Sequence, residues 1–283
     1  MSALSLPGRA ATTAIWRRRA THGLIYLALI VVAVVMLYPF WFMGRTSLFS
    51  LSQYYLGHGI SVSSWHDLFQ ALPVGRELFN STLIASSAIA LILVSATTAG
   101  YALGTLRYRF SGVVFLVIAS AMMVPMQSMI IPEFENLAKL GFVNHYYAPI
   151  LVYAALGAPF ATFLMTTYFR RLPEDVIEAS LIDGLGYGEI FFRIMLPLAI
   201  PAIVTVAVLQ FIQVWDDLLV GLLFLQTPQQ RPLTVGLATI PSQHFLDVPE
   251  LMAGSLVSAL PAVIVYLIFQ RYLIRGLTMG MSK

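Results

Sequence analysis

The chain of 283 residues contains no cysteine, only two lysines, and few charged residues of any kind, since Asp, Glu, Lys and Arg fill 10% of its positions. The missing thiols exclude disulfides, thiolate metal sites and a cysteine nucleophile, and they leave the redox compartment open. Soluble domains carry about 25% charged residues, so this composition argues against a globular protein surrounded by water. The net charge of +3 is too small and too dispersed to indicate nucleic-acid binding.

Apolar residues are abundant, at 59% of the positions, and they cluster in six runs of at least 20 residues without Lys, Arg or His. A helix needs roughly 20 apolar residues to cross hydrocarbon about 30 Å thick. The runs lack period-two alternation, and lipid leaves only helices or closed barrels able to satisfy their backbone. We therefore predict an all-α integral membrane protein with one transmembrane domain over residues 1–283. The predicted spans are 24–43, 81–106, 111–132, 146–169, 195–225 and 251–270.

Arginine and lysine are distributed unequally between the segments that separate these runs. One set of segments carries twelve of them and the other carries four. Positively charged segments tend to stay on the cytoplasmic side of the membrane. We expect both termini inside the cell, with residues 44–80, 133–145 and 226–250 outside. The first run exceeds the usual length of a signal-peptide core and no small-residue cleavage site follows it, so we expect it to be retained as a span.

Three shorter patterns predict local structure. The spacing of Trp65, Leu68, Phe69 and Leu72 favours an amphipathic helix on the outer membrane interface, with Ser63 and Ser64 as possible N-caps. A Gly-x-x-x-Gly pattern at residues 100–104 favours close packing against a neighbouring helix. Four of the prolines inside the runs can kink their helices around a pathway, or can simply reflect the tolerance of membrane helices for proline. These are Pro125, Pro159, Pro201 and Pro261.

The segment 172–193, between the fourth and fifth runs, carries the most informative pattern. Pro173 suits the first position of a helix, acids after it suit the positive helix end, and Gly184 suits the residue just past the finish. A helix of about three turns over residues 173–183 is predicted. Five of the thirteen acids fall in sixteen residues here that contain no base: Glu174, Asp175, Glu178, Asp183 and Glu189. Such a segment is either an ordinary solvated loop or a surface for a cationic partner.

At this point the residues resemble a known family. Glu178-Ala179-Ser180, Asp183-Gly184 and Leu196-Pro197 resemble the EAA loop of ABC importer permeases. Further motifs between about residues 77 and 280 resemble the maltose-type carbohydrate permeases of the same class. They are Asn80-Ser81-Thr82, Tyr101-Ala102-Leu103, Trp215-Asp216-Asp217 and Arg275-Gly276-Leu277-Thr278. Two departures are Ser180 in place of the usual Ala and a tail without the common terminal Lys-Gly.

The resemblance implies a type I importer permease of the bacterial or archaeal inner membrane, forming half of the translocation pathway for a sugar or sugar-like solute. It implies four kinds of neighbour: lipid, a second and different permease, two cytoplasmic ATPase subunits that bind ATP and Mg, and an extracytoplasmic solute-binding protein. The residues it assigns to ATPase coupling are Glu174, Glu178, Ala179, Ser180, Leu181, Asp183, Gly184, Gly186, Leu196 and Pro197. We expect no cofactor in this chain, because neither lysine follows a Gly-rich loop or precedes Ser or Thr, as a P-loop requires.

The fifth run carries the only acids inside any run, Asp216 and Asp217. Ionisable residues in a span are functional candidates by default. At about 1.5 Å per residue from Pro197 they should lie near the outer surface, where Trp215 would anchor the interface. They either serve structure or, together with Pro125, contribute to gating and solute passage. By the same resemblance, the outer loop 226–250 would reach the binding protein, with the contact between Ile240 and Phe245. The contact candidates are Pro241, Ser242, Gln243, His244 and Phe245.

Three other classes of protein compete with the importer. An ion-gradient-coupled carrier usually places acids or broken helices at mid-membrane, whereas five of the six runs here are uncharged. A membrane enzyme is disfavoured, because there is no His-Glu-x-x-His or Gly-x-Ser-x-Gly motif and the five histidines are scattered in loops without the spacing of metal ligands. A purely structural subunit leaves the acidic segment unexplained. The sequence does not specify which solute is carried.

Overall fold

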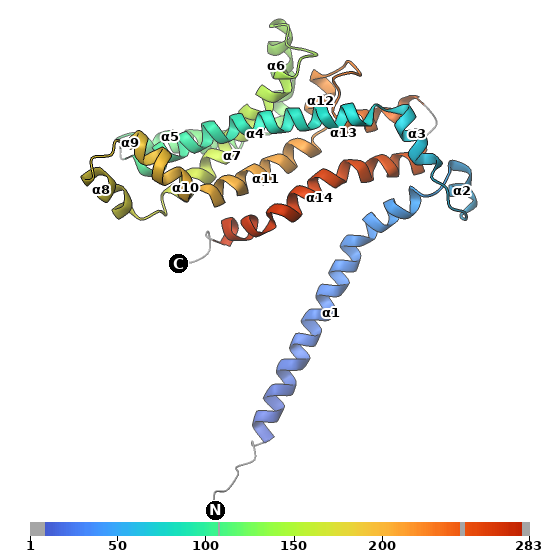
Figure 1. Ribbon diagram of the computed structural model, residues 1–283, viewed down its shortest axis with the longest axis horizontal. Helices are drawn as coiled ribbons and strands as arrows, with labels where there is room; N and C mark the ends of the chain where they lie inside the picture. The colour runs from blue at the N-terminus through green and yellow to red at the C-terminus, as the bar shows by residue number, and fades with distance from the viewer. Residues whose placement is uncertain (1–8, 107, 244–246, 279–283) are drawn as a thin grey trace, which may run out of the picture. The chain divides into compact units, whose positions relative to one another are not determined.

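The structure, a computed structural model, describes residues 9–106, 108–243 and 247–278, and every regular element in these ranges is helical. This confirms the all-α prediction. In chain order (Figure 1) the elements are α1 Arg9–Thr46, α2 Leu51–Leu56, α3 Ser63–Ala71, α4 Val74–Thr105, α5 Ser111–Ala121, α6 Met126–Lys139, α7 Tyr147–Phe169, α8 Glu174–Ile182, α9 Tyr187–Ile190, the π-helix η1 Phe191–Met195, α10 Leu196–Leu198, α11 Ile200–Asp216, α12 Leu219–Phe224, α13 Leu233–Gln243 and α14 Val248–Thr278.

In the part of the chain that the structure describes, four helical segments are long and apolar enough to cross a membrane: Thr21–Thr46 within α1, all of α4, all of α7, and Val248–Leu273 within α14. Two more spans arise only if bent pairs of helices each count as one. The axis turns by 91° between α5 and α6 and by 70° between the helix that ends at α10 and α11. The third and fifth predicted runs are therefore broken rather than straight.

Proline explains the positions of both breaks. Pro125 is the N-cap of α6, in an extended conformation, and Pro201 lies in the first turn of α11. Each lacks the N–H that would continue the preceding helix, and each disfavours a helical conformation in the residue before it. Pro159 and Pro261 lie inside the continuous helices α7 and α14.

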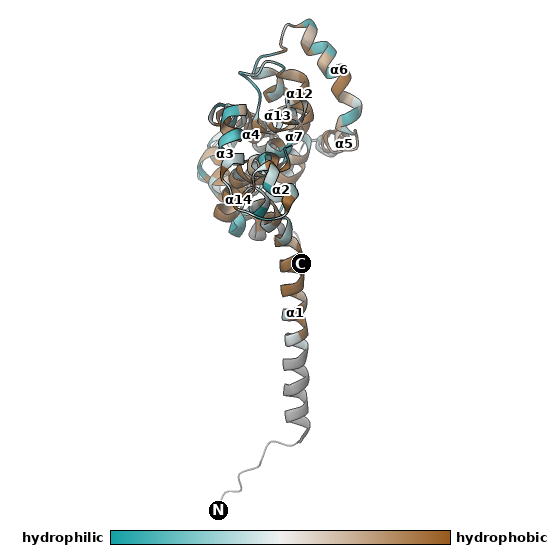
Figure 2. Ribbon diagram, turned by 90° about the vertical axis from the view of Figure 1, so that its right-hand side faces the viewer, coloured by the Kyte–Doolittle hydropathy of each residue, from teal (hydrophilic) through white to brown (hydrophobic). Residues whose placement is uncertain are grey.

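The chain divides into two compact units, one of residues 1–65 with 248–256 and one of residues 66–247 with 257–283. In the first unit, no residue in the most apolar stretch of α1 is buried against the rest of the described protein. Figure 2 colours most of the described part of this helix as hydrophobic. An apolar helix without protein packing needs lipid around it. The predicted amphipathic helix is also present as α3, although it begins at Ser63 itself.

The second unit is built on α4 and α7, which lie side by side, with α11 packed against both (Figure 1). Ile92 of α4, Met165 of α7 and Val206 of α11 are all fully or almost fully buried in one apolar cluster. The two glycines of α4 face α7: a Cβ on Gly100 would lie 2.6 Å from Cβ of Met165, and a Cβ on Gly104 would lie 2.8 Å from Cβ of Phe169. The predicted Gly-x-x-x-Gly packing is confirmed.

We expect Gly100→Ala to lower the free energy of unfolding by about 1–3 kcal/mol, because the added methyl group overpacks the contact between α4 and α7. Gly112→Ala is the matched control, since no atom of another described residue lies within 4 Å of a Cβ at this exposed position of α5. Alanine favours a helix over glycine, so the control should be as stable as the unmodified chain or more stable. Thermal unfolding of the purified chains in detergent measures both, and equal midpoints would contradict the close-packing interpretation.

Candidate functional site

The acidic segment forms α8, and its two ends are fixed by the residues that the sequence indicated. Pro173 is the N-cap, so the helix begins one residue later than predicted. At the other end Gly184 adopts a left-handed conformation with φ +86°, which glycine enters without the steric cost that other residues meet. The amide of Gly184 donates to the carbonyl of Leu181 at 3.0 Å, and that of Leu185 donates to Ser180 at 3.1 Å. This is a Schellman motif, and it turns the chain sharply.

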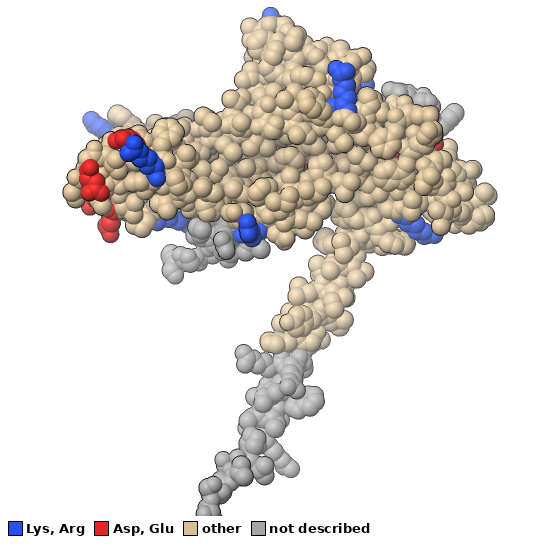
Figure 3. Space-filling model, viewed as in Figure 1, with Lys and Arg blue, Asp and Glu red and all other residues tan. Residues whose placement is uncertain are grey.

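The surface of α8 combines acids with an apolar residue that has no packing. Asp175, Glu178 and Asp183 are exposed, and within the described ranges none of their three carboxylates makes a hydrogen bond or an ion pair. Ile182 is 86% exposed. Figure 3 shows the acidic side chains gathered over α8 and α9 at the left of the view. A surface of this kind, with charge around an apolar centre, has the composition of a docking surface for another protein.

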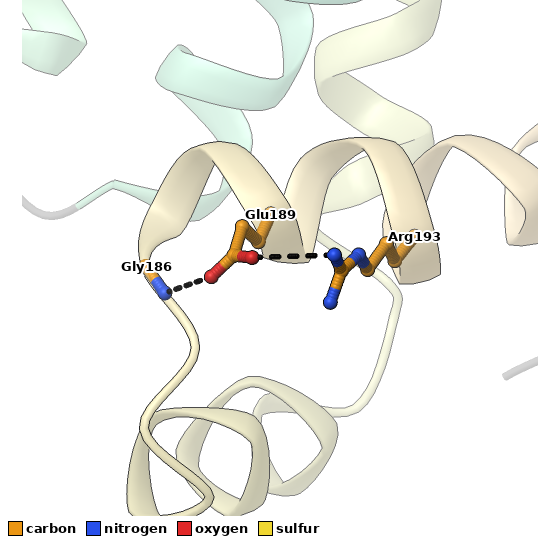
Figure 4. Close-up of polar contacts among 3 residues, drawn as sticks. All are labelled: Gly186, Glu189 and Arg193. Carbon is orange, nitrogen blue, oxygen red and sulfur yellow. Dashed lines mark hydrogen bonds and ion pairs between the residues drawn. The ribbon is translucent and has the colours of Figure 1, made fainter.

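Two residues of the segment are explained by local hydrogen bonds. The hydroxyl of Ser180 is buried and donates to the carbonyl of Val176 one turn earlier, so a serine fits where the family usually has alanine. Glu189 accepts the amide hydrogen of Gly186 at 3.3 Å and pairs with Arg193 at 3.5 Å (Figure 4). The pair is exposed and adds little stability. Glu189 nevertheless differs from the three acids that lack a partner within the described ranges, because the charge of Glu189 already has a partner in Arg193.

The loop is tied to the helices of the second unit through Tyr101 of α4. Its hydroxyl donates to the carbonyl of Tyr187 at 3.0 Å, where α9 begins. Its ring lies 5.0 Å from that of Phe191 and 5.8 Å from that of Phe169, between centroids. Tyr101 is 6% exposed, so the link is buried. A displacement of α9 therefore acts directly on α4 and on the end of α7.

After α9 the helix widens into the π-helix η1, which ends just before Leu196 and Pro197. The amide of Leu196 donates to the carbonyl of Phe191 in the wider pattern. Pro197 has no N–H, and its ring would crowd the carbonyl of Arg193 in a regular α-helix; a widened turn at this point is a known way to relieve such a conflict. Leu196 and Pro197 thus lie between the acidic loop and the bend that leads into α11.

The acids of the fifth run have different surroundings. Asp217 accepts the Tyr153 hydroxyl at 2.8 Å and the amide of Val220 at 2.9 Å, so it joins α7 to the start of α12. Trp215 is 4% exposed and donates its indole N–H to the carbonyl of Ser258 in α14 at 2.9 Å. Asp216 is exposed. The structure therefore brings Trp215 and Asp217 into contacts between helices and leaves Asp216 at the surface.

The segment between α12 and α13 is held by the start of α4. The amide group of Asn80 donates to the carbonyls of Gln229 and Arg231 at 3.1 and 2.9 Å, while its oxygen accepts the Tyr146 hydroxyl at 2.8 Å. Asn144, at φ +61°, accepts two further amides of this segment. At the end of α13, Ile240, the first residue of the predicted binding-protein contact, is buried within the chain. His244 and Phe245 lie outside the described residues, as do the side chains of Pro241, Ser242 and Gln243.

Pro125, the remaining pathway candidate, lies at the break between α5 and α6. It lines an open cavity of about 420 Å³ that also touches α7 and α11. Sequence reasoning missed this cavity and the partners Tyr153 and Asn144. A signal was present only for Asn144, since Asn tolerates the left-handed conformation of a turn better than most residues.

A model of the family described as "Binding-protein-dependent transport system inner membrane component" matches residues 96–279, which include α8, the bend and α11. The chain belongs to this family. It is therefore a multi-pass inner-membrane permease, a transport subunit of the kind that its EAA-like motif resembles.

Individual relatives agree with this membership. The chain is 32% identical over 234 residues to an osmoprotective compounds uptake permease of Synechocystis, covering 82% of this chain and 76% of the relative. It is 36% identical over 204 residues to an arabinooligosaccharides transport permease of Halalkalibacterium halodurans, covering 72% of each. Among solved structures, a bacterial ABC transporter that imports alginate matches with a TM-score of 0.75 at 22% identity, over 95% of this chain and 99% of that chain. This match supports the type I importer fold.

Proposed function

We propose that the chain forms one half of the translocation pathway of an ABC importer for a sugar or sugar-like solute, and that α8 docks into a separate cytoplasmic ATPase. The observation that carries the proposal is the surface of α8, where exposed acids surround Ile182, 86% exposed. A chain that has no P-loop lysine needs a partner to supply energy. In this proposal both termini and α8 lie on the cytoplasmic side, and the segment between α12 and α13 lies outside.

The names of the relatives support a carbohydrate as the solute. Those at 27–36% identity include permeases named for arabinooligosaccharides, for diacetylchitobiose and for melibiose, raffinose and stachyose. The complete importer would contain a second, different permease, two ATPase subunits that bind ATP and Mg, and a solute-binding protein that docks on the outer side. The cofactors of energy conversion would therefore all belong to partner subunits.

The geometry supports a route for the coupling. Closure of the ATPase pair would displace α8, and the Schellman turn at Gly184 would pass the movement to α9. Tyr101 would carry it into α4, and the π-helix before Pro197 would carry it into α11. Rigid-body movement of such bundles alternates the access to a central site.

Co-purification and activity of the assembled importer test the proposal. We expect the affinity-tagged chain to bring down an ATPase and a second permease from membranes, and the reconstituted complex to hydrolyse ATP faster when a solute-loaded binding protein is added. Solute uptake by the isolated chain, driven by a proton or sodium gradient without ATP, would instead show the rival carrier.

A further inference from the structure

The cavity at the break between α5 and α6 combines polar and apolar groups at one place in the second unit. Its walls come from the last residues of α5, the first turns of α6, the part of α7 around Pro159, and Gln213 of α11. Glu133 and Gln213 supply a carboxyl and an amide. Met129 and Phe160 supply apolar surface, and none of the described residues that line the cavity is Lys, Arg or His.

Glu133 is the unusual member of this set. Its Oε2 atom is buried and, among the described residues, has no hydrogen-bond partner. A buried carboxyl oxygen without a donor is costly unless water or a ligand supplies one. Gln213 of α11 is exposed and lines the same cavity. The two groups can accept and donate hydrogen bonds to the same occupant.

The backbone at the break argues against lipid as the occupant. Residues Met122–Pro125 separate α5 from α6 with a 91° bend, and Val124 and Pro125 line the cavity. Non-helical backbone at membrane depth is tolerated only where it is buried in protein or lines a water-filled cavity. Transporters place such broken helices beside their solutes. The break, the orphaned carboxyl oxygen and the cavity therefore point to one water-filled surface.

We propose that this cavity is the surface on which the chain contacts its solute, and that Glu133 makes it select uncharged polyhydroxylated solutes over anionic ones. The inference rests on the proposed importer function and deepens it. Vicinal hydroxyls donate to a carboxylate, the amide of Gln213 serves the remaining hydroxyls, and the apolar face of a sugar ring packs on Phe160 and Met129. A uronate, sulfonate or phosphodiester would meet an unbalanced negative charge.

The selection would set this chain apart from proteins that it resembles. One relative is named for sulfoquinovosyl glycerol, and one solved structure belongs to an importer of the acidic polysaccharide alginate. The fold is thus compatible with anionic cargo, and the charge of the cavity wall is the feature that would exclude it here.

Because the chain has no cysteine, single thiols can probe the cavity without knowledge of the cargo. We would introduce Gln213→Cys, assemble the full importer in lipid nanodiscs, and compare labelling by a cationic trimethylammonium-ethyl and an anionic sulfonatoethyl methanethiosulfonate. The increase in the mass of this chain with time gives the rate of labelling. We expect the cationic reagent to react about tenfold faster, because the two reagents differ by two unit charges beside Glu133. Adding Glu133→Gln should remove most of this preference.

Two control positions calibrate the rates. Val117→Cys lies on α5 and is 64% exposed, outside the lining of the cavity, and should react slowly with either reagent in lipid. Gln229→Cys lies in the exposed segment between α12 and α13 and should react quickly with both. If Gln213→Cys labels as slowly as Val117→Cys, lipid or a partner subunit fills the cavity and the inference is wrong. A charge preference that survives Glu133→Gln also overturns it.

The solute itself gives the second measurement. The solute released by heat from the binding protein that stimulates the importer should be an uncharged sugar, polyol or oligosaccharide by mass spectrometry. An anionic solute would refute the selection. The same preparation separates the two proposals. If the complex hydrolyses ATP in response to its binding protein but Gln213→Cys reacts equally fast with both reagents, the importer function stands and only the role of the cavity is refuted. Failure to recruit any ATPase removes the importer itself.

Discussion

The Glu178→Lys permease is expected to insert and fold normally, yet to lose at least about tenfold of the ATPase activity that a loaded binding protein elicits. Glu178 is exposed and, in the part of the chain that the structure describes, unpaired, so lysine, a good helix former, costs α8 little. Against a cationic partner surface the change replaces an attraction by a like-charge contact worth several kcal/mol. Each 1.4 kcal/mol of lost docking energy weakens the complex tenfold.

Glu135→Lys is the matched control, because it makes the same charge change at an exposed position of α6, far along the chain from α8. It should leave stimulated hydrolysis unchanged. Glu178→Gln should fall between the two, since it removes the attraction without adding repulsion. Co-purification of the ATPase separates lost docking from lost catalysis. A Glu178→Lys complex that assembled and was stimulated fully would remove α8 as the coupling element.

The sequence predicted the ends of α8 to within one residue, because Pro173 and Gly184 act through their own backbone conformations and need no partner. Four helices long enough to be spans also coincide with apolar runs of the sequence, since lipid makes the same demand of every span. The 91° bend at Pro125 was not, because proline in a membrane helix is compatible with a mild kink, a full break or none. Pro159, by contrast, lies inside the continuous helix α7 and does not break it.

The side-chain partners within the candidate site depend on tertiary structure, and no spacing in the sequence reveals them. Asp217 was recognised as an acid in an apolar run, but Tyr153, which donates to it, lies 64 positions away. Tyr101 belonged to a family-like motif without a role, and its link to the carbonyl of Tyr187 spans 86 positions. Glu133 follows Pro132 at the end of a run, and only the bend between α5 and α6 turns it toward Gln213. Local sequence signals therefore predict where the helices lie, whereas the partners of the side chains depend on contacts between residues far apart in the sequence.

Tyr101→Ala is expected to uncouple hydrolysis from transport. The ring is buried between Phe169 and Phe191, and its removal from such a site costs about 3–5 kcal/mol of local packing. The hydrogen bond to Tyr187 contributes about 1 kcal/mol more. Because α8 itself is untouched, the ATPase should still bind and hydrolyse ATP, while solute transported per ATP in proteoliposomes falls about tenfold or more.

Two further variants show whether the loss comes from this link or from general damage. Tyr101→Phe keeps the ring contacts and removes only the hydroxyl, so it should restore most of the transport per ATP. Tyr147→Ala removes a ring of the same size from the first turn of α7, where it contacts Phe142 and His145 instead of the loop. That variant should transport normally for each ATP that it consumes, even if it is less stable. Because α9 meets α4 at Tyr101, a Tyr101→Ala importer with an unchanged ratio of transport to hydrolysis would mean that movement of the loop reaches α11 through η1 alone.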